Sequence, residues 1–152
     1  MTAGPTPEQR LVELGLTLPP ARPPAGHYRG WVRSGELVFL SGQGADGHTG
    51  RLGADVDVAA GRAAARACAL NLLTQARDAL GSLDAIDRLL QLRGYVTSTP
   101  EFTGQPAVVD GASELLLQVF GERGEHARTA IGVAALPRGF AVELDLTLRA
   151  RH

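Results

Sequence analysis

The sequence predicts an α+β domain in which a single mixed β-sheet carries two helices packed on one face. Segments with strand alternation and segments with helical periodicity follow one another in the order hairpin, helix, strand, helix, strand, strand. Connections between parallel strands are right-handed, so the two helices are expected on the same side of the sheet. A chain of 152 residues, 44% hydrophobic and 20% charged, is long enough to bury one core.

The N-terminal segment, residues 1–25, is expected to form a short helix and a proline-rich connector ahead of a main domain at residues 26–152. Thr6 is the predicted N-cap of the helix, and Pro7 fits its first position. The prolines of the connector, Leu18–Pro24, exclude a regular helix or an inner strand. The connector is therefore expected to cross the surface.

A β-hairpin is predicted next. Arg29–Arg33 and Glu36–Ser41 have strand character, and a Ser34-Gly35 turn separates them. The glycine-rich stretch Ala45–Gly53 is expected to be a loop.

Two helices flank a central strand. The longer helix is predicted at Val56–Leu80, with Gly81-Ser82 as its end. Its apolar stripe, at helical spacing, consists of Ala65, Ala69, Leu72, Ala76 and Leu80. A strand with period-two alternation follows at about Leu90–Thr97, and the second helix is predicted at Gln105–Phe120.

Two strands close the chain, at Ala127–Ala134 and Phe140–Ala150. In the last strand every second residue from Phe140 to Leu148 is apolar and is expected to face the helices. That alternation turns Glu143 to the opposite, open face.

In the preceding strand, Ala127–Ala134, the hydrophobic residues Ile131 and Val133 are expected to point to the core. Arg128 would then share the open face with Glu143. An arginine and a glutamate on neighbouring strands favour a ligand site where subunits meet. An ordinary solvated sheet face fits the alternation equally well.

Composition excludes several classes of chemistry. A net charge of −1 gives no reason to expect a nucleic acid or an anionic membrane as partner, and no segment approaches the length of a membrane span. All fifteen basic residues are arginine, so no lysine can form a Schiff base. The single cysteine, Cys68, excludes an intramolecular disulfide and favours the cytoplasm. The four histidines show no metal-ligand spacing, so no metal is expected.

Several short segments, taken in order, carry a family resemblance. They are Gly26-His27-Tyr28, Phe39-Leu40-Ser41-Gly42-Gln43, His126 to Val133, Leu136-Pro137 and Val142-Glu143-Leu144. Together they resemble the Rid (YjgF, endoribonuclease L-PSP) superfamily, in a divergent branch. The resemblance implies a chorismate-mutase-like fold, a homotrimer, and ligand sites in the clefts between subunits. It also implies hydrolysis of 2-enamine and 2-imine acids to 2-keto acids and ammonia, without metal or organic cofactor.

The resemblance implies roles for individual residues, and their chemistry fits these roles. Arg128 would bind the substrate carboxylate, because its planar fork can make two parallel charge-assisted hydrogen bonds. Glu143 would orient a water or relay protons, although a structural role beside Arg128 is equally open. Tyr28 and Ser41 would line the pocket, and Gly42 would let a ligand approach the main chain.

Three positions depart from the family pattern. His126 and Ala130 stand where better-known members have a proline and a cysteine, so a cysteine-dependent step is excluded. Asp110 aligns with an asparagine at the start of the second helix. A carboxylate next to the substrate's own carboxylate is unfavourable unless it is neutralised. We still count Ala130 and Asp110 among the substrate-binding candidates.

The alternative function is a non-enzymatic protein that binds or senses a small keto acid at the same clefts. A ribonuclease, as the family's older name has it, is disfavoured because the sequence has neither a basic surplus nor a basic-aromatic run. Chorismate mutase activity would rest on fold analogy alone.

Overall fold

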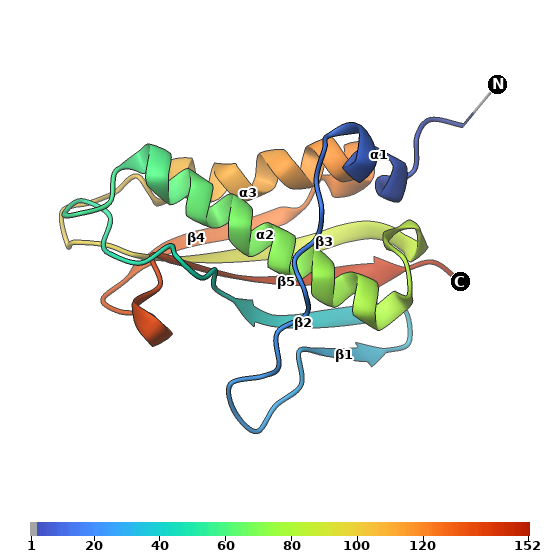
Figure 1. Ribbon diagram of the computed structural model, residues 1–152, viewed down its shortest axis with the longest axis horizontal. Coiled ribbons are helices and arrows are strands. Elements are labelled where there is room, and N and C mark those ends of the chain that lie inside the picture. Colours follow the sequence, from blue (N-terminus) through green and yellow to red (C-terminus); the bar gives the residue numbers. More distant parts are fainter. Residues whose placement is uncertain (1–2) are drawn as a thin grey trace.

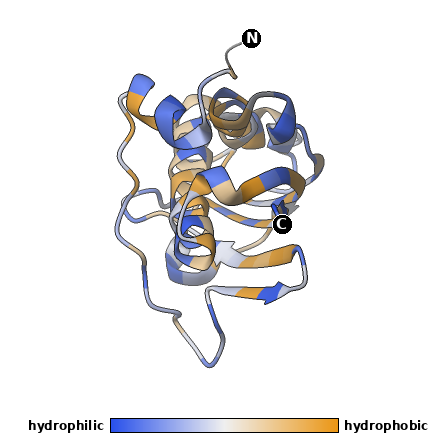
Figure 2. Cartoon of the chain, turned by 90° about the vertical axis from the view of Figure 1, so that its right-hand side faces the viewer, coloured by the Kyte–Doolittle hydropathy of each residue, from blue (hydrophilic) through white to orange (hydrophobic). Residues whose placement is uncertain are grey.

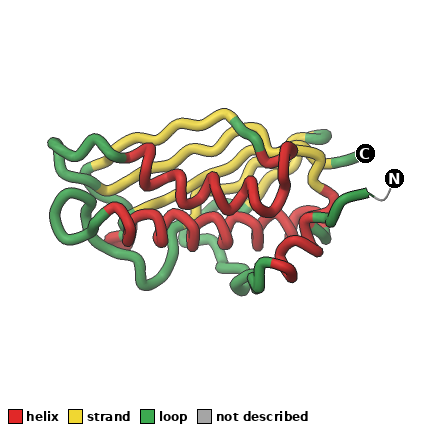
Figure 3. Tube along the Cα trace, turned by 90° about the horizontal axis from the view of Figure 1, so that it is seen from above, coloured by secondary structure: helices red, strands yellow, loops and turns green. Residues whose placement is uncertain are grey.

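A computed structural model describes residues 3–152 as two layers, a five-stranded β-sheet and helices on one of its faces (Figure 1, Figure 3). The helices are α1 (Pro7–Glu13), α2 (Val58–Leu80) and α3 (Gln105–Phe120). The strands are β1 (Trp31–Ser34), β2 (Leu37–Gln43), β3 (Ile86–Thr97), β4 (Ala127–Val133) and β5 (Val142–Ala150). The predicted α+β architecture is confirmed.

The sheet is mixed, and its strands lie in the order β1-β2-β5-β3-β4. β3 and β4 are parallel, as expected for strands joined by a helix, and the other pairs are antiparallel. β1 and β4 form the two edges. β4 therefore has one strand neighbour, and α3 crosses over from β3 to reach it.

The core lies between the helices and the inner face of the sheet. Ala65, Ala69, Leu72 and Ala76 of the predicted α2 stripe have no exposed surface. Facing them from β5 are buried side chains at every second position, namely Val142, Leu144, Leu146 and Leu148. α2 ends at Gly81, whose φ of 82° is the left-handed conformation predicted for this stop.

α2 and α3 lie side by side and touch closely through glycine (Figure 3). A Cβ on Gly111 of α3 would lie 2.2 Å from the carbonyl oxygen of Arg62 in α2. Gly94 has the same role beneath α3, because a Cβ there would lie 2.6 Å from Val109. Small residues at these contacts set the height of α3 above β3 and β4.

The N-terminal helix packs on the main layer. Thr6 caps it as predicted, in a reciprocal pair of hydrogen bonds with Gln9. Leu11 is 2% exposed and joins the core. The Glu8 carboxylate accepts hydrogen bonds from the Nε and Nη2 atoms of Arg77, which ties α1 to the end of α2. None of the helices in residues 3–152 has the length and apolar content to cross a membrane.

The strand starts differ from those predicted. β1 begins at Trp31, two residues later than expected, and β3 begins at Ile86, four residues earlier. The register of β3 against β5 shifts twice, between Ile86 and Arg88 and between Leu89 and Gln91. A bulge interrupts the two-residue alternation, so the first half of β3 lacks the pattern that identifies a strand.

The second face of the sheet carries no helix in residues 3–152 (Figure 3). Large hydrophobic side chains are exposed there, and both strands of the β1–β2 hairpin carry hydrophobic stretches (Figure 2). They are Val32 (52% exposed), Leu37 (38%), Phe39 (46%) and Ile131 (45%). The prediction that Ile131 faces the core is therefore wrong. We call this surface the open face.

Candidate functional site

Arg128 lies on the helix-covered side of β4, and the prediction that it shares the open face with Glu143 is wrong. Arg128 pairs with Leu92 and Ala130 pairs with Gly94 in the parallel β3–β4 register, and paired residues point to the same side. Leu92 is fully buried and Gly94 lies under α3. Arg128 and Ala130 therefore point toward α3.

The guanidinium of Arg128 is held by α3. Its Nη1 atom donates to Oδ1 of Asp110 at 2.6 Å and to Oγ of Ser113 at 3.2 Å. Its Nη2 atom donates to the carbonyl oxygen of Pro106 at 3.3 Å. Within residues 3–152, Nε and one Nη2 hydrogen have no partner. Arg128 is thus oriented and partly neutralised, yet it keeps donors for a ligand.

A histidine extends this network. Nδ1 of His126 lies 2.6 Å from the carbonyl oxygen of Gly124, which can only accept, so Nδ1 carries a proton. In the neutral ring, Nε2 then accepts the hydroxyl hydrogen of Ser113, 2.9 Å away. The Ser113 oxygen is left to accept from Arg128. His126, which departs from the family pattern, therefore fixes the orientation of the Ser113 hydroxyl beside Arg128.

Ala130 contributes no polar group to this network. It is half-buried and packs on the core beside Gly94. Cys68 cannot supply a missing thiolate, because it is fully buried and burial raises its pKa to about 12. The chemistry available around Arg128 is therefore carboxylate binding and hydrogen bonding.

Glu143 lies on the other side of the sheet. Its neighbour Leu144 is buried against Gly94, which turns the Glu143 carboxylate to the open face, beside Gly42 of β2. Burial raises the pKa of Glu143 above its ordinary value, and the carboxylate of Asp145 adds to the shift. A glutamate that holds its proton more tightly suits a proton relay.

Tyr28 and Ser41 lie at the same end of the hairpin as Gly42. The Ser41 hydroxyl donates to the carbonyl oxygen of Arg29 at 2.6 Å, which commits its hydrogen to the fold. The Tyr28 hydroxyl accepts from the main-chain nitrogen of Ala25 at 3.3 Å, and the residue is 52% exposed. Tyr28 and Gly42 line a small cavity of about 70 Å³.

One chain does not bring the two groups together. Glu143 is on β5 and Arg128 on β4, with β3 between them, which is roughly 10 Å across the sheet at ordinary strand spacing. Their partners on β3, Tyr95 and Leu92, are three positions apart, which adds roughly 10 Å along the strands. They also lie on opposite faces. A site that uses both side chains needs a second copy, whose open face would approach the β4 edge of the first.

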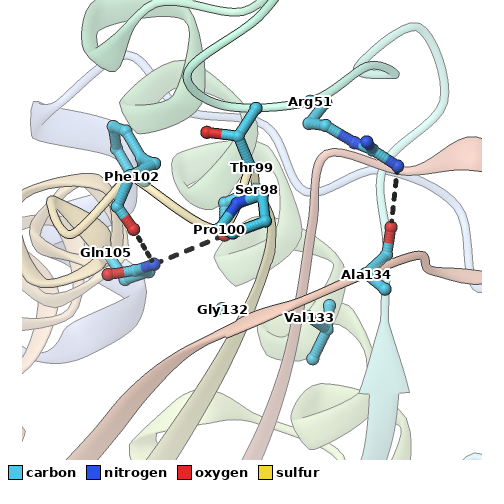
Figure 4. Close-up of a pocket in the computed structure, with 9 residues that line it drawn as sticks. All are labelled: Arg51, Ser98, Thr99, Pro100, Phe102, Gln105, Gly132, Val133 and Ala134. Carbon is cyan, nitrogen blue, oxygen red and sulfur yellow. Dashed lines mark hydrogen bonds between the residues drawn. The ribbon is translucent and has the colours of Figure 1, made fainter.

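A cavity where β3 and β4 end was not predicted. Its volume is about 420 Å³, and Figure 4 shows Arg51 on one side of it and Phe102 and Gln105 on the other. Its residues come from three segments that are distant in sequence. No local motif marks it, so the sequence gives no signal for it beyond the presence of Arg51 in a glycine-rich loop.

Comparisons with known proteins agree with this architecture. Residues 8–142 match the model of the YjgF/chorismate mutase-like endoribonuclease family. Protein TCP17 of Trypanosoma cruzi is 49% identical over 141 residues, which cover 89% of this chain and 88% of TCP17. The structure of Atu1372 from Agrobacterium tumefaciens superimposes with a TM-score of 0.88 at 44% identity, covering 95% and 92% of the two chains. A structure from Shewanella oneidensis gives 0.91 at 35% identity, covering 95% and 99%.

Proposed function

Because this chain belongs to the YjgF/chorismate mutase-like endoribonuclease family, we propose that it hydrolyses small 2-enamine and 2-imine acids to 2-keto acids and ammonia. The proposed sites are clefts between the copies of a cytoplasmic homotrimer. The observation that carries the proposal is the guanidinium of Arg128, held by Asp110, Ser113 and the Pro106 carbonyl at the edge of the sheet. This arrangement presents the remaining donors in one fixed orientation.

In this reaction the protein mainly needs to position the substrate and a water molecule. A protonated imine carbon is already electrophilic, and water adds to it to give a carbinolamine. Loss of ammonia from the carbinolamine leaves the keto acid, so one water enters and one ammonia leaves. Arg128 would hold the substrate carboxylate through its Nε and Nη2 hydrogens. Glu143 of a neighbouring copy would take a proton from the water and return it to the leaving nitrogen.

The open face supports self-association. Its exposed side chains include Phe39 and Ile131, an apolar surface that a single chain leaves in contact with water. The edge strand β4 also leaves main-chain groups without a strand partner on its outer side. Contact between these two regions would cover the apolar surface and bring Glu143 toward Arg128.

The experiment generates 2-aminoacrylate enzymatically and follows ammonia release. Arg128→Ala is expected to lower the catalysed rate at least a hundredfold, because both orientation and charge stabilisation are lost. The matched control is Arg62→Ala, since Arg62 also binds a carboxylate and a main-chain carbonyl of α3, through Glu114 and Ala107. Equal rates for wild type and Arg128→Ala would remove the proposal.

A second function is favoured by one observation. Asp110 already binds the Arg128 guanidinium, and Ala130 has no reactive side chain. These two residues suit the binding of a ligand better than its chemical conversion. A non-enzymatic protein that binds a small keto acid would show heat of binding with 2-oxobutyrate and no ammonia release from any imine. Absence of 2-oxobutyrate binding would count against both functions.

A further inference from the structure

We propose that the cavity where β3 and β4 end is a second binding site, which takes an organic carboxylate with an apolar body. It is separate from the Arg128 site. Gly132, which lines the cavity, lies four residues beyond Arg128 on β4, roughly 13 Å away at the rise of a strand. The proposal does not depend on the reaction proposed above.

Main-chain hydrogen bonds hold the walls of the cavity. The main-chain nitrogen of Leu52 donates to the carbonyl oxygen of Thr97 at 2.8 Å. The main-chain nitrogen of Thr99 donates to the carbonyl oxygen of Leu52 at 3.0 Å. The nitrogen of Ser98 donates to the carbonyl oxygen of Val133 at 3.1 Å. Leu52 is fully buried. Arg51 therefore extends from a segment that is fixed to the sheet.

Arg51 supplies positive charge to the cavity. Its Nη2 atom donates to the carbonyl oxygen of Ala134 at 3.1 Å, which places the guanidinium at the rim (Figure 4). Among the residues that the structure describes, no carboxylate forms a salt bridge with the Arg51 guanidinium and no acidic side chain lines the cavity. The Asp55 carboxylate bonds instead to the main-chain nitrogen of Arg51, at 2.7 Å. Arg128 differs, because Asp110 offsets its charge. The unused N–H groups of Arg51 can bind a carboxylate in two parallel hydrogen bonds.

The floor is polar and ordered. Nε2 of Gln105 donates to Oγ of Ser98 at 3.3 Å and to the carbonyl oxygen of Phe102 at 2.8 Å (Figure 4). Gly132 makes this arrangement possible, because a Cβ there would lie 2.6 Å from Oγ of Ser98 and 2.7 Å from Nε2 of Gln105. Ser98 is 8% exposed, so its position is set by the fold.

The remaining walls are apolar. Phe102, from the loop before α3, lines the cavity together with Pro100 and Val133, and Val133 lies on the side opposite Phe102 (Figure 4). A volume of about 420 Å³ exceeds what a three- or four-carbon acid fills. The combination of a charged rim, a polar floor and an aromatic wall fits an aryl or branched carboxylic acid.

Calorimetric titration with benzoate and phenylacetate tests this site, with benzyl alcohol as the uncharged analogue. Wild type is expected to bind both acids and not the alcohol. Arg51→Gln is expected to raise Kd at least tenfold, and Gly132→Ala to do the same by displacing the Ser98 and Gln105 side chains. Arg33→Gln, at an exposed position on the opposite edge of the sheet, is the control and should leave Kd unchanged.

Arg128→Ala separates this site from the one proposed above. Unchanged benzoate affinity in Arg128→Ala, together with loss in Arg51→Gln, supports a second site. Equal affinity in wild type and Arg51→Gln overturns the proposal, as does the absence of binding in wild type. Loss of benzoate binding in Arg128→Ala alone would show that the acid occupies the Arg128 cleft, and would overturn it as well.

Discussion

The carboxylate of Asp110 lies 2.6 Å from Nη1 of Arg128, so the arginine that the sequence marks as a ligand-binding residue already has an anionic partner. The Asp110 side chain is 47% exposed and that of Arg128 is 23% exposed. Both members of the pair are therefore partly accessible to water. A substrate carboxylate must share the guanidinium with Asp110 or displace it.

Asp110→Asn is therefore expected to tighten the binding of 2-oxobutyrate. The asparagine keeps a hydrogen-bond acceptor for Arg128 and removes the repulsion between two carboxylates. That repulsion is about 1 kcal/mol for a partly exposed pair, which corresponds to roughly fivefold in Kd. Calorimetry of wild type and Asp110→Asn measures the change.

The control for this substitution is Glu114→Gln, which removes the carboxylate of the Arg62 pair on the same helix. Its Kd should match that of wild type. Weaker binding in Asp110→Asn would mean that Asp110 assists the ligand by holding Arg128 in place, which is the opposite of the expected effect.

Glu143→Gln is expected to raise the melting temperature near pH 7 and to have no effect near pH 3. Burial, and then Asp145, raises the pKa of Glu143 in the folded chain. The folded chain consequently binds this proton more tightly than the unfolded chain, so stability falls as the pH rises from the unfolded pKa through the folded pKa. Glutamine removes that loss, and the gain should be about 1 kcal/mol or less.

Thermal unfolding at several pH values between these limits measures this effect. Glu101→Gln, at an exposed position in the loop before α3, is the matched control substitution. An equal shift for Glu143→Gln at pH 3 and at pH 7 would show that ionisation is not its cause.

The fold could be predicted because its strongest local patterns agree with its tertiary structure. The α2 stripe and the left-handed Gly81 mark a long helix and its end, and the alternation in β5 separates a buried row from an open one. β3 was harder. The bulges near Arg88 and Gln91 take up extra residues, and their position depends on pairing with β5.

The face of β4 could not be predicted from its own residues. Alternation divides the strand into two rows, but the row with Ile131 is the more hydrophobic and points to the open face. The covered row holds Ala130, Gly132 and Arg128, because α3 lies close to it and binds the arginine. The usual rule that hydrophobic residues face the core gives the wrong orientation here, because a single chain leaves this apolar row exposed.

The cavity where β3 and β4 end, with Arg51 at its rim, could not be predicted for a different reason. The arginine reaches the ends of β3 and β4 because Leu52 bonds to the main chain of Thr97 and Thr99. These contacts join residues more than forty positions apart, and no spacing in the sequence records them. A glycine-rich loop has many possible conformations, so its side-chain direction follows only from the folded sheet.

Phe39→Glu is expected to abolish self-association. Phe39 is 46% exposed on the open face and is paired with Val32 across the hairpin. A charge placed there would have to lose its water on contact with a second copy, which is strongly unfavourable without a partner. Sedimentation velocity should show an oligomer for wild type and a single chain for the variant.

The control for Phe39→Glu is Val12→Glu, a similar change at a position that is 78% exposed on α1 and away from the sheet. It should leave the oligomer intact. A wild-type protein that sediments as a single chain at micromolar concentration would contradict the proposed clefts, and so would an unchanged oligomer in Phe39→Glu.

Gly111→Ala is expected to destabilise the fold by about 1–3 kcal/mol, the range for overpacking a tight contact. A Cβ at this position would lie 2.2 Å from the carbonyl oxygen of Arg62, a main-chain atom that cannot rotate away. α3 must move outward from α2, and since α3 carries Asp110 and Ser113, the orientation of Arg128 would change with it. Denaturant unfolding should therefore show a lower midpoint together with weaker 2-oxobutyrate binding. Gly4→Ala, where a Cβ would meet no atom within 4 Å, is the matched substitution and should change neither quantity. If Gly111→Ala were as stable as wild type, the close contact between α2 and α3 would not be what sets the position of α3, and the stability assigned to it would have to come from elsewhere in the core.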